Sequence, residues 1–205
     1  MKEQHAPQTE VDAIMSCIEK NLTIDKSSLK LGGTIESAMK RFEELHAETA
    51  QHCLRVGLLS ARVAERLHFN ARDKVDVTLS GFFHDIGKAA DVLLVENRLS
   101  EKEIDYVKNQ KHAQVGASLL SNMNYPKKIV EIVQKHHDEN KWFENKLALS
   151  TQIVMAADRF DAIQAERWYK PSTGFEQAWL KLKPSFGISF DPMLEKPFEK
   201  AIYNE

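Results

Sequence analysis

Apolar residues recur every three or four positions along most of the chain, which is the spacing of one face of an α-helix. The pattern is clearest in two neighbouring segments, and it is formed by Val56, Leu59, Val63 and Leu67 in the first and by Val75, Leu79, Phe82, Phe83 and Ile86 in the second. Gly87 is expected to stop the second helix. No segment shows the sustained alternation of a β-strand, so the sequence predicts an all-α fold.

Three further helical faces follow in the second half of the chain. The first is formed by Ile104 and Val107, which lead into Val115, Leu119 and Leu120, and the pattern allows a break before Ala113. The second is formed by Ile129, Ile132 and Val133, and the third by Ile153, Val154, Ala157, Ala162 and Ala165. The Asn124-Tyr125-Pro126 turn separates the first two of these faces. A last helix is expected from about Phe175 to Leu182, because Pro184 cannot continue it.

The N-terminal segment differs from the rest of the chain. Residues 1–9 are polar, and residues 23–33 form a linker rich in Ser, Lys and Gly. A short helix is expected between them, on a face made by Val11, Ile14, Ile18 and Leu22. Thr34 is suited to cap the next helix. A chain of 205 residues fits one domain with such an extension. We therefore expect an N-terminal helix and linker at 1–33 and a single-domain helical bundle at 34–205.

Composition narrows the class of protein. The net charge of −2 and the isoelectric point near 6.5 provide no basic surface for duplex nucleic acid, so an anionic substrate must be held by local charge. Cys17 and Cys53 are too few for a disulfide framework. The N-terminus has no signal-peptide pattern, and no stretch approaches the roughly 18 apolar residues of a membrane span. These features predict a cytoplasmic protein without membrane contact.

Polar groups interrupt the apolar faces at positions that should be buried. They are His52, His84, Asp85, His112, His136, His137 and Asp158. One inward His is usually a satisfied core residue, and one inward Asp is usually a cap or half of an ion pair. Here several separate helices each send such a group inward, where a carboxylate is costly unless it is paired or binds a metal. His and carboxylate suit Fe, Mn or Zn, and the set exceeds the shell of one ion, so a binuclear site is predicted.

The order of these residues resembles the HD superfamily of metal-dependent phosphohydrolases, and most closely its HD-GYP branch of bacterial cyclic-di-GMP phosphodiesterases. The shared pattern is an isolated His, the run His84-Asp85-Ile86-Gly87-Lys88, a later His, a His-His pair and a final Asp. Three further segments are similar to that branch: Ala157-Asp158-Arg159-Phe160-Asp161-Ala162, Arg167-Trp168-Tyr169-Lys170-Pro171 and Phe190-Asp191-Pro192. The resemblance covers about residues 34 to 202 and implies a bundle of HD-domain type.

The resemblance also implies roles for individual residues. The inward histidines and aspartates would be the metal ligands, and Asp85 is the expected bridging carboxylate. Lys88 would contact a phosphate oxygen of the substrate, so Asp85 and Lys88 are the candidate catalytic residues. Arg167 and Lys170 match positions that bind nucleotide phosphate in this branch, although two solvated surface cations are equally compatible with the sequence.

The number of metal ions is open between two and three. Glu48 and Asp161 match positions where some members of the branch carry an extra ligand, and those members hold three metals. Glu48 lies four residues before His52, and Asp158 lies three residues before Asp161, so each pair can face one ion from a single helical face. The ligand types suit Fe and Mn at least as well as Zn.

One departure from the branch concerns the loop after the His-His pair. The Gly-Tyr-Pro motif that names the branch is missing, and no glycine occurs between Gly116 and Gly174. Asp138 stands where Glu is usual. A shorter loop would leave one side of the cleft open, which predicts modest affinity and loose discrimination among cyclic dinucleotides.

The function expected from this resemblance is hydrolysis of a cyclic dinucleotide, such as cyclic-di-GMP, by a hydroxide that the metal ions activate. A nucleotide phosphomonoesterase of the HD superfamily is the alternative among enzymes. A non-catalytic module that binds nucleotide or a signalling partner is the alternative from another class, although such relatives typically lose several ligands. The expected partner is a small anionic nucleotide, and the segment before Thr34 leaves room for a homodimer or a signalling protein.

Overall fold

The computed structural model describes residues 47–88, 112–138, 143–144, 147–164 and 174–203. Its α-helices are α3 (Ala47–Arg66), α4 (Ala71–Phe83), α7 (His112–Asn122), α8 (Lys127–Lys135), α9 (Leu149–Gln164), α10 (Phe175–Leu182) and α11 (Glu195–Tyr203). Two short 3₁₀ helices, Lys183–Ser185 and Pro192–Leu194, join α10 to α11. Within these ranges no strand forms beyond an isolated bridge between Phe186 and Phe190, so the all-α class is confirmed.

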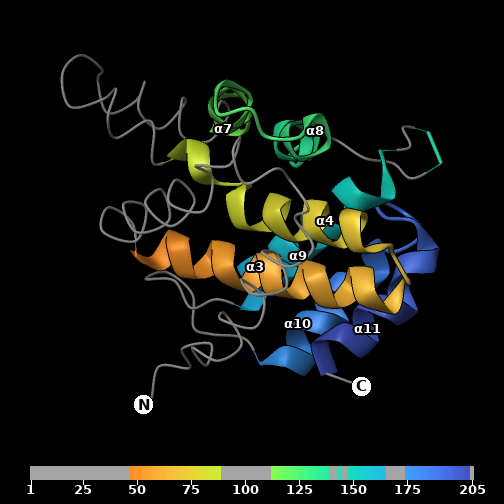
Figure 1. Cartoon of the computed structure of the whole chain (residues 1–205). Coiled ribbons are helices and arrows are strands. Elements are labelled where there is room, and N and C mark those ends of the chain that lie inside the picture. Colours follow the sequence, from red (N-terminus) through yellow and green to blue (C-terminus); the bar gives the residue numbers. More distant parts are fainter. Residues whose placement is uncertain (1–46, 89–111, 139–142, 145–146, 165–173, 204–205) are drawn as a thin grey trace.

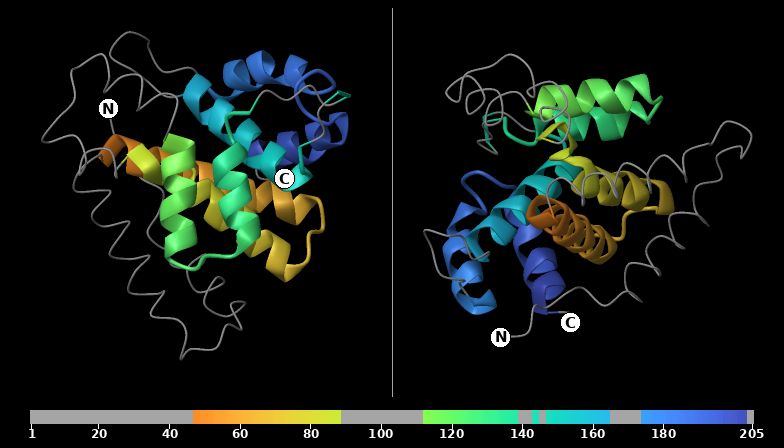
Figure 2. Two further views of the ribbon diagram at one scale, coloured as in Figure 1. Left: turned by 90° about the horizontal axis from the view of Figure 1, so that it is seen from above. Right: turned by 90° about the vertical axis from the view of Figure 1, so that its left-hand side faces the viewer.

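The helices form three layers. Helices α3 and α4 run side by side through the middle, with α9 behind them, while α7 and α8 lie above and α10 and α11 lie below (Figures 1 and 2). Helix α3 packs against α4, α9 and α11, and α4 also packs against α8 and α9. The middle layer therefore packs against α8, α10 and α11, whereas α7 packs chiefly against α8.

Two apolar clusters hold the layers together. The first joins α3 and α9 to the C-terminal helices, and its largest side chains include Trp179, Phe190 and Phe198. The second joins α4 to α7 and α8 through residues such as Phe83 and Ile129, both 1% exposed or less. Burial of apolar area on this scale is the main force that holds such a bundle together.

Glycine allows α3 and α4 to approach closely. A Cβ atom on Gly81 would lie 2.7 Å from the Cα atom of Gly57, and a Cβ atom on Gly57 would lie 2.6 Å from the ring of Phe82. Gly87 approaches the start of α7 in the same way, because a Cβ atom there would collide with the carbonyl oxygen of His112. These contacts set the distance between the helices that carry the inward histidines.

Most helix positions agree with the sequence, and α10 has the expected bounds. The expected helix through Gly87 is wrong in one respect, because α4 ends at Phe83 and residues 84–85 form a turn before a short helical segment at 86–88. Phe175–Leu182 is also not the last helix, since Leu194, Phe198 and Ile202 place an apolar face of α11 in the core. The expected helix at 11–22, the linker, the Thr34 cap and the face at 104–107 lie outside the described residues.

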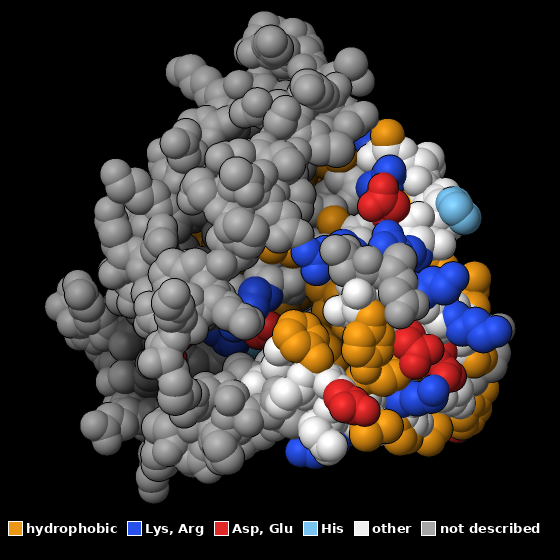
Figure 3. Space-filling view, turned by 90° about the horizontal axis from the view of Figure 1, so that it is seen from below, with side chains coloured by type: hydrophobic (Ala, Val, Ile, Leu, Met, Phe, Trp, Pro, Cys, Tyr) orange, Lys and Arg blue, Asp and Glu red, His pale blue; other side chains and the backbone are white. Residues whose placement is uncertain are grey.

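The lower face of the molecule is chemically mixed. Figure 3 shows hydrophobic side chains between Lys, Arg, Asp and Glu side chains on this face. Exposed apolar residues of the C-terminal elements include Phe175, Leu180, Ile188 and Met193. No helix among the described residues is long and apolar enough to cross a membrane.

We expect Gly81→Ala to destabilise the fold. The new methyl group would meet the backbone of α3 rather than a flexible side chain, so the two helices must separate. Overpacking of this kind costs about 1–3 kcal/mol, which outweighs the roughly 1 kcal/mol that Ala gains over Gly in a helix. Urea denaturation measures the change. Gly174→Ala is the matched control, because nothing lies within 4 Å of its Cβ position, and equal stability of both variants would contradict the prediction.

Candidate metal centre

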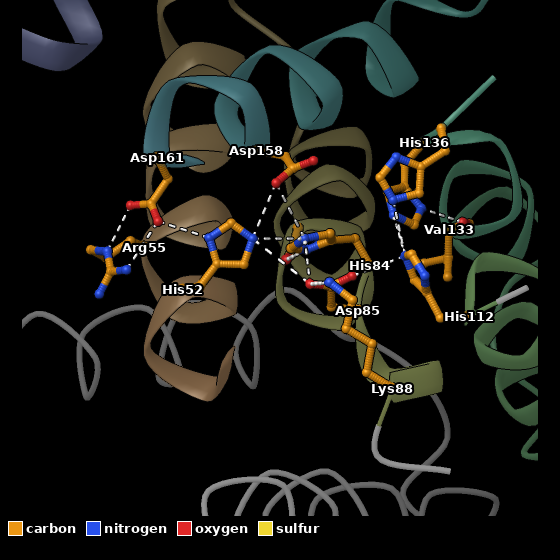
Figure 4. Close-up of polar contacts among 12 residues, drawn as sticks. His52, Arg55, His84, Asp85, Lys88, His112, Val133, His136, Asp158 and Asp161 are labelled. Carbon is orange, nitrogen blue, oxygen red and sulfur yellow. Dashed lines mark hydrogen bonds and ion pairs between the residues drawn. The ribbon is translucent and has the colours of Figure 1, made fainter. Parts of the chain in front are cut away.

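The inward polar residues predicted from the sequence lie together in the fold. They are His52 on α3, His84 and Asp85 in the turn after α4, His112 at the start of α7, His136 and His137 in the turn after α8, and Asp158 on α9. Figure 4 shows most of these side chains pointing toward one another from separate helices. The site therefore lies where the middle layer meets α7 and α8.

A first group of ligand atoms lies on the side of α3 and α9. The Nε2 atom of His52 lies 3.2 Å from His84 Nε2, 3.1 Å from Asp158 Oδ1 and 3.9 Å from Asp85 Oδ2. His84 Nε2 lies 3.5 Å from Asp85 Oδ2 and 3.8 Å from Asp158 Oδ1. An ion bound at about 2.1 Å holds neighbouring ligands about 3.0–3.5 Å apart, so these spacings suit one coordination shell.

A second group lies on the side of α7 and α8. His112 Nε2 lies 2.9 Å from His137 Nε2 and 3.4 Å from His136 Nε2. The same nitrogen lies 3.1 Å from Asp85 Oδ1. Three imidazole nitrogens and a carboxylate oxygen could hold a second ion.

Asp85 belongs to both groups through different oxygens. Its Oδ2 atom lies near His52 and His84, and its Oδ1 atom lies near His112. Oδ1 is buried and accepts no hydrogen bond in the structure. An unsatisfied buried carboxylate oxygen is costly, and a cation on that side would satisfy it. The position of Asp85 thus fits a carboxylate that bridges two ions.

Several of the histidines are oriented by contacts between Nδ1 and an oxygen acceptor on the side of the ring away from the centre. The contacts run from His84 to the carbonyl oxygen of Gly81 at 2.8 Å, from His136 to the carbonyl oxygen of Val133 at 2.6 Å, and from His52 to Asp161 Oδ2 at 2.7 Å. Because these acceptors take the Nδ1 proton, the neutral form of each ring presents its Nε2 lone pair to the centre. Such support from behind is the usual arrangement of histidines that bind metal.

The carboxylates of the centre are ionised despite their burial. Burial opposes the charge on Asp85, but its electrostatic interactions with His84, His112 and Lys88 outweigh it and hold the pKa of Asp85 well below its usual range. Burial also opposes the charge on Asp158, and a hydrogen bond from His52 reverses the balance and lowers the pKa of Asp158. Both side chains are therefore ready to bind a cation at neutral pH.

The histidines divide into two electrostatic types. Burial and the neighbouring histidines lower the pKa values of His136 and His137, so these rings are neutral. Burial also opposes a charge on His52, but its hydrogen bonds to Asp158 and Asp161 raise its pKa to about 9. A metal bound at His52 must therefore displace a proton from Nε2 near neutral pH.

Lys88 lies at the edge of the centre. Its Nζ atom donates to Asp85 Oδ2 at 2.6 Å, and the side chain is 35% exposed. An ammonium group has three donors, so two remain for groups on the exposed side. Lys88 is thus a cation that lies beside the shared carboxylate and faces solvent.

The other residues singled out from the sequence lie elsewhere. Glu48 is exposed in the first turn of α3. The Asp161 carboxylate lies behind the ring of His52, away from both groups of ligand atoms (Figure 4). The third ion assigned to these two residues stays a prediction. Arg167 and Lys170 lie outside the described residues.

Arg55 is a feature that the sequence analysis did not find. Its guanidinium group donates to both oxygens of Asp161, at 2.6 Å from Nε and 2.9 Å from the second terminal nitrogen. The sequence does show that Arg55 lies one helical turn after His52, so that a cation and a candidate ligand share one face of the helix. The partner, more than 100 residues later in the chain, could not be inferred from that spacing.

Comparison with known proteins agrees with this architecture. A model of the HD domain family matches residues 49–163. A cyclic di-GMP phosphodiesterase of Thermotoga maritima is 30% identical over 167 residues, which span 75% of this chain and 44% of that protein. A 3'3'-cGAMP-specific phosphodiesterase of Vibrio cholerae is 25% identical over 166 residues, spanning 75% of this chain and 35% of that protein.

A solved structure is also similar. The HD domain of the L. monocytogenes phosphodiesterase PgpH has a TM-score of 0.59 and 16% identity, and the match covers 82% of this chain and 95% of that domain. A second structure of that domain, with cyclic-di-AMP, has a TM-score of 0.57. At this identity the likeness concerns the fold alone. The chain belongs to the HD domain family, and it spans less than half the length of the two relatives above.

We expect Asp85→Asn to weaken metal binding in both groups, because one amide replaces the anionic oxygens that face each of them. Helical circular dichroism should be retained, since the substitution keeps the size of the side chain. Elemental analysis after dialysis against Mn²⁺ would measure the loss. Glu176→Gln, on the exposed start of α10, is the control. Full metal content in Asp85→Asn would show that Asp85 is not a metal ligand.

The pKa of His52 predicts how stability depends on pH in protein stripped of metal with a chelator. The folded state keeps the His52 proton up to about pH 9, whereas an unfolded histidine loses it near 6.5. The stabilisation is therefore complete below pH 6.5 and disappears as the pH rises to about 9, by up to about 3 kcal/mol. Urea unfolding at pH 6 and pH 9, compared with His52→Gln, tests this. Parallel pH profiles for both proteins would contradict it.

Proposed function

We propose that this chain is a metal-dependent phosphodiesterase that hydrolyses a cyclic dinucleotide. The observation that carries the proposal is the sharing of Asp85 between two groups of metal-ligating atoms. Membership of the HD domain family and the names of the phosphodiesterase relatives support it. The residues that would hold the ions are His52, His84, Asp85 and Asp158 in the first group and His112, His136, His137 and Asp85 in the second.

The chemistry follows from the type of site. Divalent ions in this centre would generate hydroxide from water near neutral pH and offset the charge of a phosphate. Asp85 would fix the two positions relative to each other, because one rigid carboxylate contributes an oxygen to each group. No nucleophilic side chain is needed for such a hydrolysis. Two divalent ions, with Fe or Mn favoured by the ligand types, are the cofactors that we propose.

Lys88 would bind the phosphate from the exposed side. Asp85 holds its ammonium group beside the centre, and its remaining donors can bind phosphate oxygens through charge-assisted hydrogen bonds. Negative charge on these oxygens grows as hydroxide adds to phosphorus. A preorganised cation at that position lowers the barrier more than it strengthens binding of the substrate.

The proposed substrate class rests on what the ligands named for similar proteins have in common. The names of similar proteins include cyclic di-GMP and 3'3'-cGAMP, and a structure of similar fold contains cyclic-di-AMP. These ligands differ in their bases and share two phosphodiesters in a small anionic ring. We therefore propose the cyclic dinucleotides as a class. Arg167 and Lys170 are proposed to hold the second phosphate, on the resemblance of their segment to the HD-GYP branch.

A side-by-side hydrolysis assay tests the proposed function. Protein loaded with Mn²⁺ or Fe²⁺ should cleave cyclic-di-GMP, 3'3'-cGAMP and cyclic-di-AMP to linear dinucleotides, as measured by chromatography. Arg167→Ala should raise KM without lowering metal content, because it removes the proposed phosphate contact and changes none of the proposed metal ligands. Activity on nucleoside monophosphates alone, unchanged in Arg167→Ala, would replace the proposal with a phosphomonoesterase. Binding without hydrolysis of any of these compounds would replace it with a non-catalytic module.

Lys88→Met should keep the metal ions and lower kcat by about 10²–10³, because a charge that stabilises the transition state is removed. Metal content is measured in the same samples, so loss of ions can be told apart from loss of rate. Lys181→Met, on the exposed side of α10, is the matched control. Activity of Lys88→Met within a few-fold of the wild type would leave Lys88 as a cation that only stabilises the end of its helix.

A further inference from the structure

Two carboxylates of α9 contact opposite nitrogens of one imidazole ring. Asp158 and Asp161 lie one helical turn apart and both face α3. Asp158 Oδ1 lies 3.1 Å from His52 Nε2, and Asp161 Oδ2 lies 2.7 Å from His52 Nδ1 (Figure 4). Since Nε2 is the atom that faces His84 and the first group, Asp158 lies on the metal side of the ring and Asp161 lies on the opposite side.

Arg55 fixes the carboxylate of Asp161. The guanidinium group lies on α3, one turn after His52, and contacts both Asp161 oxygens in a two-pronged arrangement. Asp161 is 5% exposed, whereas the Arg55 side chain is 43% exposed. Arg stays protonated in proteins, and its planar fork matches a carboxylate in geometry. Asp161 is thereby held as an anionic hydrogen-bond acceptor in one orientation.

An anionic acceptor at Nδ1 determines what the other nitrogen of His52 can do. The Nδ1 proton stays between the ring and Asp161, so the Nε2 lone pair is the one that a metal ion can use. His84 and His136 obtain the same support from main-chain carbonyls three residues before them, which are fixed by the helix. At His52 the support comes from side chains, so mutation can remove it.

We propose that Arg55 and Asp161 form a positioning pair that sets the tautomer and the orientation of His52, and thereby the metal affinity of the first group. The pair does not touch the ion. This role differs from the ligand to a third ion that the resemblance implies for Asp161, because both of its oxygens are already engaged by Arg55 and His52. The inference extends the proposed function and rests on its metal centre, whereas it does not depend on which substrate is hydrolysed.

Titration calorimetry with Mn²⁺ on Asp161→Asn and Arg55→Gln tests the pair, with Glu176→Gln, on the exposed start of α10, as the control. Removal of such support typically weakens a metal site about 10- to 100-fold, so we expect that loss for one ion in Asp161→Asn. Arg55→Gln should lose less, since the carboxylate remains. Arg55→Lys should recover part of the loss, because it restores the charge without the planar fork. Saturated stoichiometry should be unchanged, and Glu176→Gln should bind like the wild type.

The tautomer of His52 gives a second measurement that general damage to the fold would not imitate. Nitrogen-15 NMR of histidine side chains in Zn²⁺-loaded protein should report Nδ1–H and bound Nε2 for His52, and Asp161→Asn should weaken or shift this signature selectively. Loss of one whole ion in both Asp161→Asn and Glu48→Gln, with the other ions unaffected, would instead make Asp161 a ligand of a third ion. Unchanged affinity and an unchanged spectrum in Asp161→Asn would overturn the pair.

The calorimetry also separates this inference from the proposed function. If the wild type hydrolyses no cyclic dinucleotide while Asp161→Asn still weakens Mn²⁺ binding, the positioning pair stands and the substrate class fails. If the wild type hydrolyses them and Asp161→Asn binds Mn²⁺ normally, the pair fails and the proposed function stands.

Discussion

The arrangement of this protein depends on one buried carboxylate. Asp85 is 2% exposed, and it remains charged because histidines from several helices and Lys88 surround it. An isolated charge at such a depth would be prohibitively costly, so the helices that bring these cations and imidazoles must stay close to it. The same requirement makes the centre fit for a metal ion, because the imidazoles that compensate the charge of Asp85 are also candidate metal ligands. Stability of the bundle and occupancy of the centre are therefore coupled, as in other sites whose ligands come from separate elements.

Close packing of the helices is the second constraint, and it acts through glycine. Ring nitrogens about 3 Å apart on α3 and after α4 require the two helices to approach until Gly57 and Gly81 touch. The approach of Gly87 to the start of α7 does the same for His112, which comes directly opposite Asp85. A side chain at any of these positions would separate the ligand groups without changing a single ligand. The run from His84 to Lys88 thus combines two ligands, a glycine contact and a cation within one turn.

The inward His and Asp residues of this site could be predicted from the sequence because they interrupt the hydrophobic periodicity of their helices. Each inward His or Asp interrupts an apolar face, and the family resemblance then orders them into a ligand set that the structure brings together. The end of α4 at Phe83 could not be predicted in this way, because the apolar spacing continues through Ile86 beyond the end of the helix. The role of Asp161 was also beyond the sequence. A carboxylate one helical turn after a ligand can face the metal ion or the far side of another ligand. The contact of Asp161 with Arg55, which lies 106 residues earlier in the sequence, distinguishes these two positions.

The two sides of the centre differ in their surroundings, and this difference is relevant to how the proposed substrate would bind. On one side Arg55 and Asp161 hold a ligand from behind, and on the other the exposed His137 and the half-exposed Lys88 border solvent. Among the described residues, the side chains that form the centre are imidazoles, carboxylates and an ammonium group, which suit a metal ion and a phosphate. In the proposed function, phosphodiester chemistry and base preference would therefore be separate properties. The ligand set around Asp85 would supply the first, and residues outside that set would supply the second.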